Sequence, residues 1–256
     1  MQIQQKFKVP ILTYHSIDSS GSVISTSPDV FRRQIYFLGE NGYNVVPLNA
    51  FISSLFENYP LPRKTIVMTF DDGFQNFYTT AFPILERYGF KATVFLVTDY
   101  CGKRNQWEIN SPGIPLSSML SWTEIRQLTE CGIEFGAHTR SHPDLTGISL
   151  AEAEREIVES KDAIENALGC RVTTFAYPYG RFNRAVKKIA ENNFQAAVST
   201  VLGKARLNSD VFSLERIDAY YLSNPKIFSL MPSKTFDGYM RVRQAMRDVK
   251  NLISRN

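Results

Sequence analysis

The sequence predicts an α/β fold, a closed (β/α) barrel that forms a single domain. Two observations lead to this prediction. Short apolar runs typical of buried strands alternate with segments of helical periodicity, which is the order expected of a parallel sheet covered by helices. Seven or eight such units follow one another without a shift in composition over the 256 residues, which favours one closed barrel over an open sheet or two domains.

The predicted strands are short continuous apolar runs, as in strands that are buried on both faces. The first, VPILTYH, ends at His15, and the third, TIVMTF, ends just before a pair of aspartates. The full set comprises residues 9–15, 44–48, 65–70, 91–97, 133–138, 173–178, 194–200 and 212–218.

The predicted helices carry recognisable start and stop signals. Ser27 and Pro28 supply an N-cap and a first-turn proline. Serine followed three residues later by glutamate, at 121/124 and at 149/152, predicts two capping boxes. The expected helices run from residue 27 to 42, for a short stretch after 49, through 82–88 to 89, from 121 to 132, from 149 to 169 and onward from about 183.

Composition excludes several classes of protein. Apolar residues make up 43% of the chain and charged residues 21%, as in globular proteins. The formal charge of +4 comes without a dense Lys/Arg block, so no nucleic-acid partner is expected. Three scattered cysteines predict neither a disulfide framework nor a zinc knuckle. Because no secretory apolar region and no membrane-spanning run occur, the chain as given is interpreted as cytoplasmic, or as extracytoplasmic if a leader has been removed.

Residues 69–73, TFDDG, place Asp71 and Asp72 side by side at the end of a predicted buried strand. Two adjacent carboxylates repel each other in a dry site, and a divalent cation removes the conflict. One aspartate would bind the metal and the other would act as a base. Gly73 permits a tight turn that lets both side chains converge. The alternative is that one aspartate N-caps a helix.

Two of the three histidines, His138 and His142, lie four residues apart in HTRSH, directly after another predicted strand. If this segment forms a helical turn, both imidazoles share one face and suit two ligands of one metal ion. The carboxyl ends of the strands of a parallel barrel open onto one face, so we expect the histidines beside the aspartates. The alternative is a pair of surface histidines.

A third segment, FAYPYG at 175–180, also follows a predicted strand. Pro178 fixes the turn, and Tyr179 offers a ring and a backbone N–H that would face an oxyanion. An ordinary strand-to-helix turn would show the same pattern.

Taken in this order, TFDDG, HTRSHPDL and FAYPYG resemble the motifs of the polysaccharide deacetylase family, also called the NodB-homology or carbohydrate esterase family 4 domain. The resemblance extends from ILTYHSI to SLERIDAY, so the single domain is taken as residues 1–256. It implies a distorted (β/α)7-type barrel that lacks one unit. It also implies a divalent metal, usually zinc, on Asp72, His138 and His142, with Asp71 as the general base.

The same resemblance implies a reaction, the removal of N-acetyl groups from poly- or oligosaccharides that contain N-acetylglucosamine. The segments YHSI and FAYPYG are similar to those of the branch that deacetylates poly-β-1,6-N-acetylglucosamine. An N-acetylated glycan is therefore the expected partner.

Two departures from the family pattern concern catalytic residues. Many members carry an arginine two residues before the proline of the third motif, where this chain has Ala176. Arg216 is a candidate to replace it, although a surface ion pair is the simpler interpretation. Many members also carry a C-terminal histidine as the general acid, but no histidine follows His142. We therefore expect His15 to protonate the leaving amine; the alternative is a histidine that merely satisfies hydrogen bonds at a strand end.

Two further segments have predicted roles. Residues 98–120 form a long irregular insertion in which Trp107 is a candidate stacking platform for sugar rings. Residues 237–254 are expected to form a basic amphipathic helix that packs on the barrel; the alternative is a weak contact with a membrane surface. The oligomeric state does not follow from the sequence. The apolar face of this helix would comprise Val242, Ala245, Met246, Val249, Leu252 and Ile253.

Three alternative functions use the same residues. A metal-dependent hydrolase of a non-sugar amide bond would need the same metal and base. An inactive barrel that binds glycans would explain the missing arginine and histidine. A mononuclear iron oxygenase also uses two histidines and one carboxylate, but the second aspartate and the family resemblance count against it.

Overall fold

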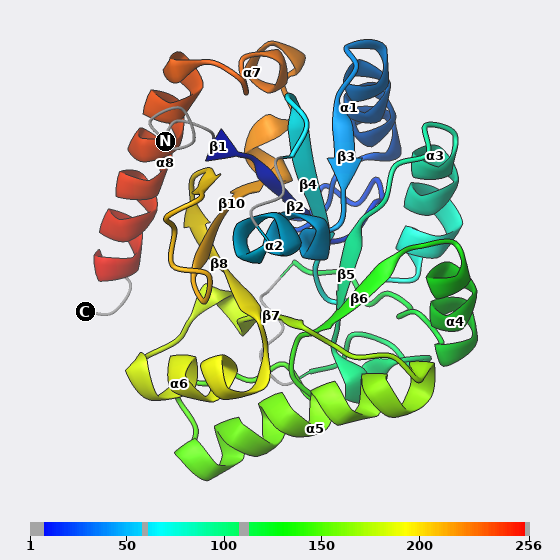
Figure 1. Cartoon of the computed structure of the whole chain (residues 1–256), viewed down its shortest axis with the longest axis vertical. Coiled ribbons are helices and arrows are strands. Elements are labelled where there is room, and N and C mark those ends of the chain that lie inside the picture. Colours follow the sequence, from blue (N-terminus) through cyan, green and yellow to red (C-terminus); the bar gives the residue numbers. More distant parts are fainter. Residues whose placement is uncertain (1–7, 58–60, 108–112, 254–256) are drawn as a thin grey trace.

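The structure, a computed structural model, describes residues 8–57, 61–107 and 113–253 (Figure 1). The strands are β1 (Lys8–Val9), β2 (Ile11–Tyr14), β3 (Asn44–Val46), β4 (Thr65–Phe70), β5 (Thr93–Leu96), β6 (Glu134–Ala137), β7 (Thr174–Ala176), β8 (Ala196–Leu202), β9 (Ala205–Arg206) and β10 (Leu214–Asp218). The α-helices are α1 (Pro28–Glu40), α2 (Leu48–Phe56), α3 (Phe82–Glu86), α4 (Trp122–Glu130), α5 (Leu150–Leu168), α6 (Arg184–Asn193), α7 (Pro225–Ser229) and α8 (Lys234–Ile253).

Seven parallel strands of the described chain close into a barrel. Strand β2 pairs with β10 on one side and with β4 on the other, which completes the ring β2–β4–β5–β6–β7–β8–β10. Strand β3 lies outside this ring: Val67 of β4 pairs with both Ile11 of β2 and Val46 of β3, so β3 and β5 share one edge of β4. The expected distorted (β/α)7-type barrel in a single domain is confirmed.

Helix α2 fills one end of the barrel (Figure 1). Its side chains Leu48, Phe51 and Ile52 are buried in one apolar cluster with the first residues of three strands, Ile11 of β2, Ala196 of β8 and Leu214 of β10. Because these residues begin their strands, α2 closes the N-terminal end of the barrel. The carboxyl ends of the strands, where barrel enzymes place their chemistry, remain open for a site.

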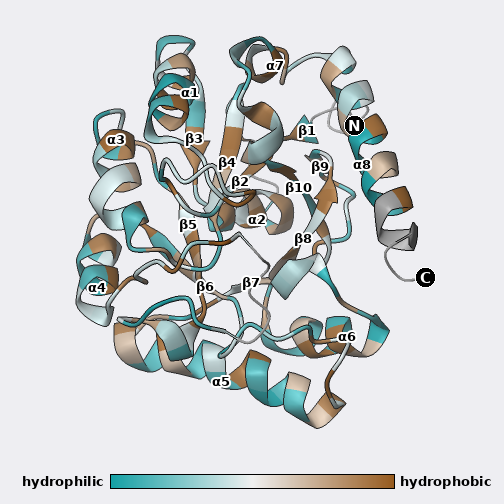
Figure 2. Ribbon diagram, turned by 180° about the vertical axis from the view of Figure 1, so that it is seen from behind, coloured by the Kyte–Doolittle hydropathy of each residue, from teal (hydrophilic) through white to brown (hydrophobic). Residues whose placement is uncertain are grey.

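The helices around the barrel bury one face each. In Figure 2 the barrel strands are largely hydrophobic, whereas α5 alternates hydrophobic and hydrophilic residues along its length. The predicted capping signals are present in part. Ser27 accepts a hydrogen bond from the amide of Val30, and Ser121 and Glu124 form a complete capping box, whereas Ser149 acts as a simple N-cap that accepts from the amide of Glu152. Within the described residues, no helix is both long enough and apolar enough to cross a membrane.

The C-terminal helix α8 begins at Lys234, three residues before the predicted start, and residue 254 lies outside the described residues. The predicted packing face is wrong. Val242 and Met246 are each 61% exposed and Val249 is 57% exposed, so these side chains point away from the barrel. The helix packs through Phe236 and Met240 instead, which are 1% and 2% exposed and belong to the main apolar cluster.

Candidate metal and catalytic site

The carboxyl ends of five barrel strands bring the candidate residues together. Asp71 and Asp72 follow β4, His138 follows β6 and Pro178 follows β7. His15 follows β2, and Arg216 lies within β10. The sequence-based expectation that these segments meet on one face is confirmed for the described residues.

Asp72, His138 and His142 form a compact cluster of buried donor atoms. Oδ1 of Asp72 lies 3.4 Å from Nε2 of His138 and 3.4 Å from Nε2 of His142, and one donor atom from each of the three residues lies within 4.8 Å of the others. Two donors bound at about 2.0–2.1 Å to one tetrahedral zinc ion would be about 3.3 Å apart. The donor set and its spacing therefore fit a divalent metal of this kind.

Hydrogen bonds fix the orientation of both imidazoles. Nδ1 of His138 lies 2.7 Å from the carbonyl oxygen of Ala176, so Nδ1 carries a proton and Nε2 is the ring nitrogen that faces Asp72. Nδ1 of His142 lies 3.0 Å from the hydroxyl of Tyr179, which itself donates to the carbonyl oxygen of His142. Burial also lowers the pKa of His142 to about 3, which keeps the ring neutral, as a metal ligand must be.

The backbone at the site is unusual. Asp72, Thr139, His142 and Tyr179 all adopt positive φ, at 71°, 67°, 63° and 58°, a region that costs energy for residues other than glycine. The HTRSH segment is thus an irregular loop and not the expected helical turn. Two left-handed residues in the loop allow both histidines to reach one aspartate.

Glu156 of α5 holds this loop from behind. Its Oε2 accepts hydrogen bonds from the backbone amides of Arg140 and Ser141, both at 2.9 Å, and its Oε1 accepts from the Ser141 hydroxyl at 2.7 Å. Its position on α5 gave no signal in the sequence, because the contact joins a helix to a loop that the sequence did not predict in detail.

We expect Glu156→Ala to weaken metal binding by about 10-fold or more, the usual effect of losing a group that orients metal ligands. Metal affinity can be measured by competition with a chromophoric chelator. Glu159→Ala is the matched control, since Glu159 lies one turn further along α5 and its carboxylate pairs with the side chain of Arg140, not with the loop backbone. Equal metal affinity in wild type and Glu156→Ala would show that the loop holds its ligands without this carboxylate.

Asp71 binds Arg216 through two hydrogen bonds. Nη1 of Arg216 lies 2.7 Å from Oδ1 of Asp71, and Nη2 lies 2.6 Å from Oδ2. Arg216 is only 1% exposed, so the expectation of a surface ion pair is wrong. The guanidinium reaches the aspartate from β10.

This ion pair sets the charge state of Asp71. Burial alone would raise the pKa of Asp71, but the positive charge and the two hydrogen bonds of Arg216 outweigh it and lower the pKa below its usual value. The carboxylate is therefore ionised and held in one orientation, as a general base requires.

The remaining candidates lie around these two carboxylates. Nε2 of His15 is 3.9 Å from Oδ2 of Asp71, and the His15 side chain is 21% exposed. Trp107 is only 5% exposed, and its ring centroid lies 4.9 Å from that of His142. Pro178 is buried at the turn that positions Tyr179.

Comparisons with known proteins show which family this chain resembles in sequence and in fold. Residues 58–197, more than half of the chain, match the polysaccharide deacetylase family. The chain belongs to this family. The crystallised Streptococcus pyogenes deacetylase PplD, in complex with acetate, is 30% identical with a TM-score of 0.73 over 83% of this chain and 92% of that chain.

Two further proteins are similar to this chain over most of its length. The poly-β-1,6-N-acetyl-D-glucosamine N-deacetylase of Staphylococcus epidermidis is 25% identical over 245 residues, which are 91% of this chain and 80% of that protein. The structure of IcaB from Ammonifex degensii is 22% identical and covers 88% of this chain and 97% of its own, with a TM-score of 0.73; it supports the fold. This polysaccharide deacetylase domain is thus a hydrolase with an Asp-His-His metal-ligand cluster at the open end of its barrel.

Proposed function

We propose that this polysaccharide deacetylase removes N-acetyl groups from polymers or oligomers of N-acetylglucosamine, with a divalent metal, zinc, on Asp72, His138 and His142. The observation that carries the proposal is the placement of the ionised Asp71 beside a metal-ligand cluster of the right spacing. The Staphylococcus epidermidis relative, named for this reaction on the β-1,6-linked polymer, supports the choice of substrate.

Each residue of the site has a separate role in the proposed reaction. Asp72, His138 and His142 would hold the divalent metal, which would supply polarisation of the acetyl carbonyl and a lowered pKa of a water molecule. Asp71 takes the proton of the attacking water, and Arg216 keeps its carboxylate ionised and oriented. The backbone N–H of Tyr179 donates to the developing oxyanion. His15 protonates the departing amine, because an amide nitrogen leaves poorly as an anion.

The test of the proposed function is the release of acetate and free amine from N-acetylglucosamine oligomers of β-1,6 and β-1,4 linkage. We expect turnover on at least one series, with the β-1,6 series preferred. Turnover on simple non-sugar amides but on neither series would favour the alternative amide hydrolase. Glycan binding without acetate release, by protein that contains stoichiometric metal, would favour the inactive binding barrel.

His15→Ala is expected to retain fold and metal while kcat falls by at least about 10²-fold, the effect of losing a general acid. The loss should be smaller for an aryl acetate, since its leaving group departs without a proton. Steady-state kinetics on an oligomer and on the ester, together with metal content, check this result. Full amidase activity in the folded, metal-containing variant would assign the proton donor elsewhere.

The proposal also covers the residues that border the sugar site and a contact between helix α8 and a membrane surface. Trp107 and Pro178 are proposed to border the sugar site; at 5% exposure Trp107 would offer a ring edge more than a broad stacking face. The outward Val242, Met246 and Val249 of α8 support a weak contact with a membrane surface.

A further inference from the structure

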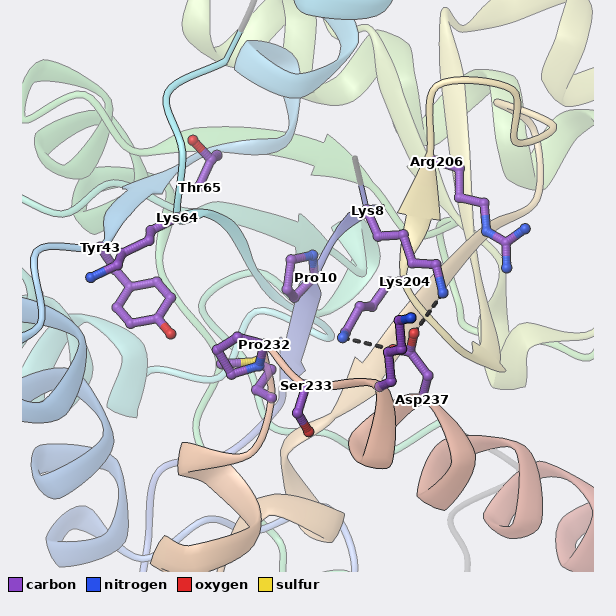
Figure 3. Close-up of a pocket in the computed structure, with 12 residues that line it drawn as sticks. Lys8, Pro10, Tyr43, Lys64, Thr65, Lys204, Arg206, Pro232, Ser233 and Asp237 are labelled. Atoms are coloured by element: carbon purple, nitrogen blue, oxygen red, sulfur yellow. Dashed lines mark hydrogen bonds and ion pairs between the residues drawn. The ribbon is translucent and has the colours of Figure 1, made fainter. Parts of the chain in front are cut away.

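A hollow of about 720 Å³ opens at the N-terminal end of the barrel (Figure 3). Its charges are taken up within the protein: Asp237 pairs with Lys8 at 2.5 Å and with Lys204 at 2.7 Å, and Lys64 donates to the carbonyl oxygen of Asn41 at 2.9 Å. We therefore assign no ligand to this hollow. The polar contacts that bear on the proposed reaction lie at the opposite end of the strands.

The imidazole of His15 is not held by hydrogen bonds of its own. Its Nε2 lies 3.9 Å from Oδ2 of Asp71, too far for a hydrogen bond. Within the part of the chain that the structure describes, the ring nitrogens of His15 make no hydrogen bond. A general acid must come within about 2.6–3.2 Å of the atom that it protonates, so the place of this ring depends on the backbone on either side of it.

The backbone before His15 is fixed to the segment that carries Asp71. The amide of Asp71 donates to the carbonyl oxygen of Tyr14 at 2.9 Å, and Tyr14 pairs with Phe70 in the parallel ladder between β2 and β4. The proposed acid and the proposed base therefore follow two neighbouring strands, and the ladder sets where both segments start.

The backbone after His15 is bound by the side chain of Asn76. Oδ1 of Asn76 accepts a hydrogen bond from the amide of Ile17 at 3.0 Å, and Nδ2 donates to the hydroxyl oxygen of Ser16 at 2.6 Å. Because a backbone N–H can only donate, Oδ1 must be the atom that faces Ile17, which gives both bonds a defined direction. Two bonds from one amide thus hold the two residues that follow His15.

Asn76 forgoes its usual local role to make these bonds. It stands at the start of a π-helical segment, Phe77–Ala81, where an asparagine side chain ordinarily caps the amides of the first turn. Its side chain makes no such cap bond and instead reaches residues 59 and 60 positions away. Single turns of π-helix are frequent at functional sites. Asn76 lies five residues after Asp71, so one segment carries the proposed base and also binds the backbone beside the proposed acid.

We propose that Asn76 is a positioning residue for the deacetylation step, which holds His15 at the place from which it protonates the departing amine. The proposal rests on the proposed function, in which Asp71 is the base and His15 the acid. Asn76 acts through His15, by fixing Ser16 and Ile17. A misplacement of about 1 Å can lower the rate of an enzyme by about 10²-fold, so the loss of this anchor has a measurable effect.

The test begins with Asn76→Leu in the full chain, which removes both hydrogen bonds and keeps a side chain of similar size. We expect kcat on an N-acetylglucosamine oligomer to fall by about 10- to 100-fold, with KM and metal content little changed. The loss should be smaller on an aryl acetate, whose leaving group needs no proton. Gln75→Leu is the matched control, since this neighbouring amide donates to Glu124 of α4 at 2.8 Å and should leave kcat as in wild type.

Combining His15→Ala with Asn76→Leu separates a positioning role from a general one. The double variant should be no slower on the oligomer than His15→Ala alone, because a residue that acts through His15 then has nothing left to position. Losses that multiply in the double variant overturn the proposal. So does a loss in Asn76→Leu that is equal on the oligomer and on the ester.

The imidazole NMR signals of His15, assigned by their absence in His15→Ala, test the placement without turnover. We expect these signals to shift in Asn76→Leu and to stay in place in Gln75→Leu. Unchanged signals in Asn76→Leu overturn the proposal. If the signals respond as expected but wild type releases no acetate from any oligomer, the deacetylase function fails while the placement of His15 by Asn76 stands.

Discussion

Asp71→Asn is expected to lower kcat by as much as about 10⁴-fold while the protein keeps its full complement of metal. The carboxamide has nearly the shape of the carboxylate but cannot accept a proton from water, so the step that needs a base is lost. Asp71 is held by Arg216 and does not belong to the cluster of Asp72, His138 and His142, which is why its loss should leave the metal cluster intact. Steady-state kinetics and elemental analysis on the same preparation measure the two effects.

Asp72→Asn is the matched partner of this experiment, one residue along the same turn. It should lose the metal, because Oδ1 of Asp72 is the oxygen that faces both histidines. His138→Ala should behave in the same way, since two protein ligands rarely retain a catalytic zinc. Metal loss in Asp71→Asn together with retention in Asp72→Asn would mean that the two aspartates have the opposite roles.

Arg216→Met is expected to destabilise the protein by about 3–5 kcal/mol, the usual cost of leaving one partner of a buried ion pair alone. For a chain of this size that corresponds to a fall in Tm of roughly 6–20 °C. The cause is the carboxylate of Asp71, which is 3% exposed and would lose both hydrogen bonds from the guanidinium. Activity should fall as well, because the base would be neither oriented nor reliably ionised. Thermal denaturation and kinetics give the two readouts.

Combining Arg216→Met with Asp71→Leu separates stability from function. Replacing both partners of a buried pair by apolar groups is often neutral or stabilising, so the double variant should recover much of the lost Tm and none of the activity. If the single Arg216→Met variant has the Tm of wild type, the ion pair contributes nothing to stability. Any loss of turnover in that variant would then reflect the role of Arg216 in orienting and ionising Asp71.

The sequence predicted the barrel and the metal cluster because both depend on local signals. Apolar runs with capped helices between them define the alternating units, and TFDDG and HTRSH each follow a strand, so their meeting at one end of the barrel follows from topology. The i, i+4 argument reached the right histidines through the wrong geometry, because positive φ at Thr139 and His142 bends the chain into a loop.

Contacts between segments far apart in the chain could not be predicted from the sequence. Arg216 and Asp71 are 145 positions apart, and only the closure of the barrel brings β10 beside β4 through β2. A single arginine in a strand pattern gives no sign of whether it faces the barrel interior or the solvent. The outward apolar face of α8 was missed for a similar reason: periodicity identifies a face, but which face packs depends on the partner surface.

The most direct test of the account is acetate release from a β-1,6-linked N-acetylglucosamine oligomer by the metal-stripped protein, before and after zinc is restored. We expect no measurable release from the stripped protein and full recovery at one equivalent of zinc, with Asp72→Asn inactive under both conditions. Acetate release that is equal with and without metal would contradict the assignment of Asp72, His138 and His142 as the ligands of a catalytic ion.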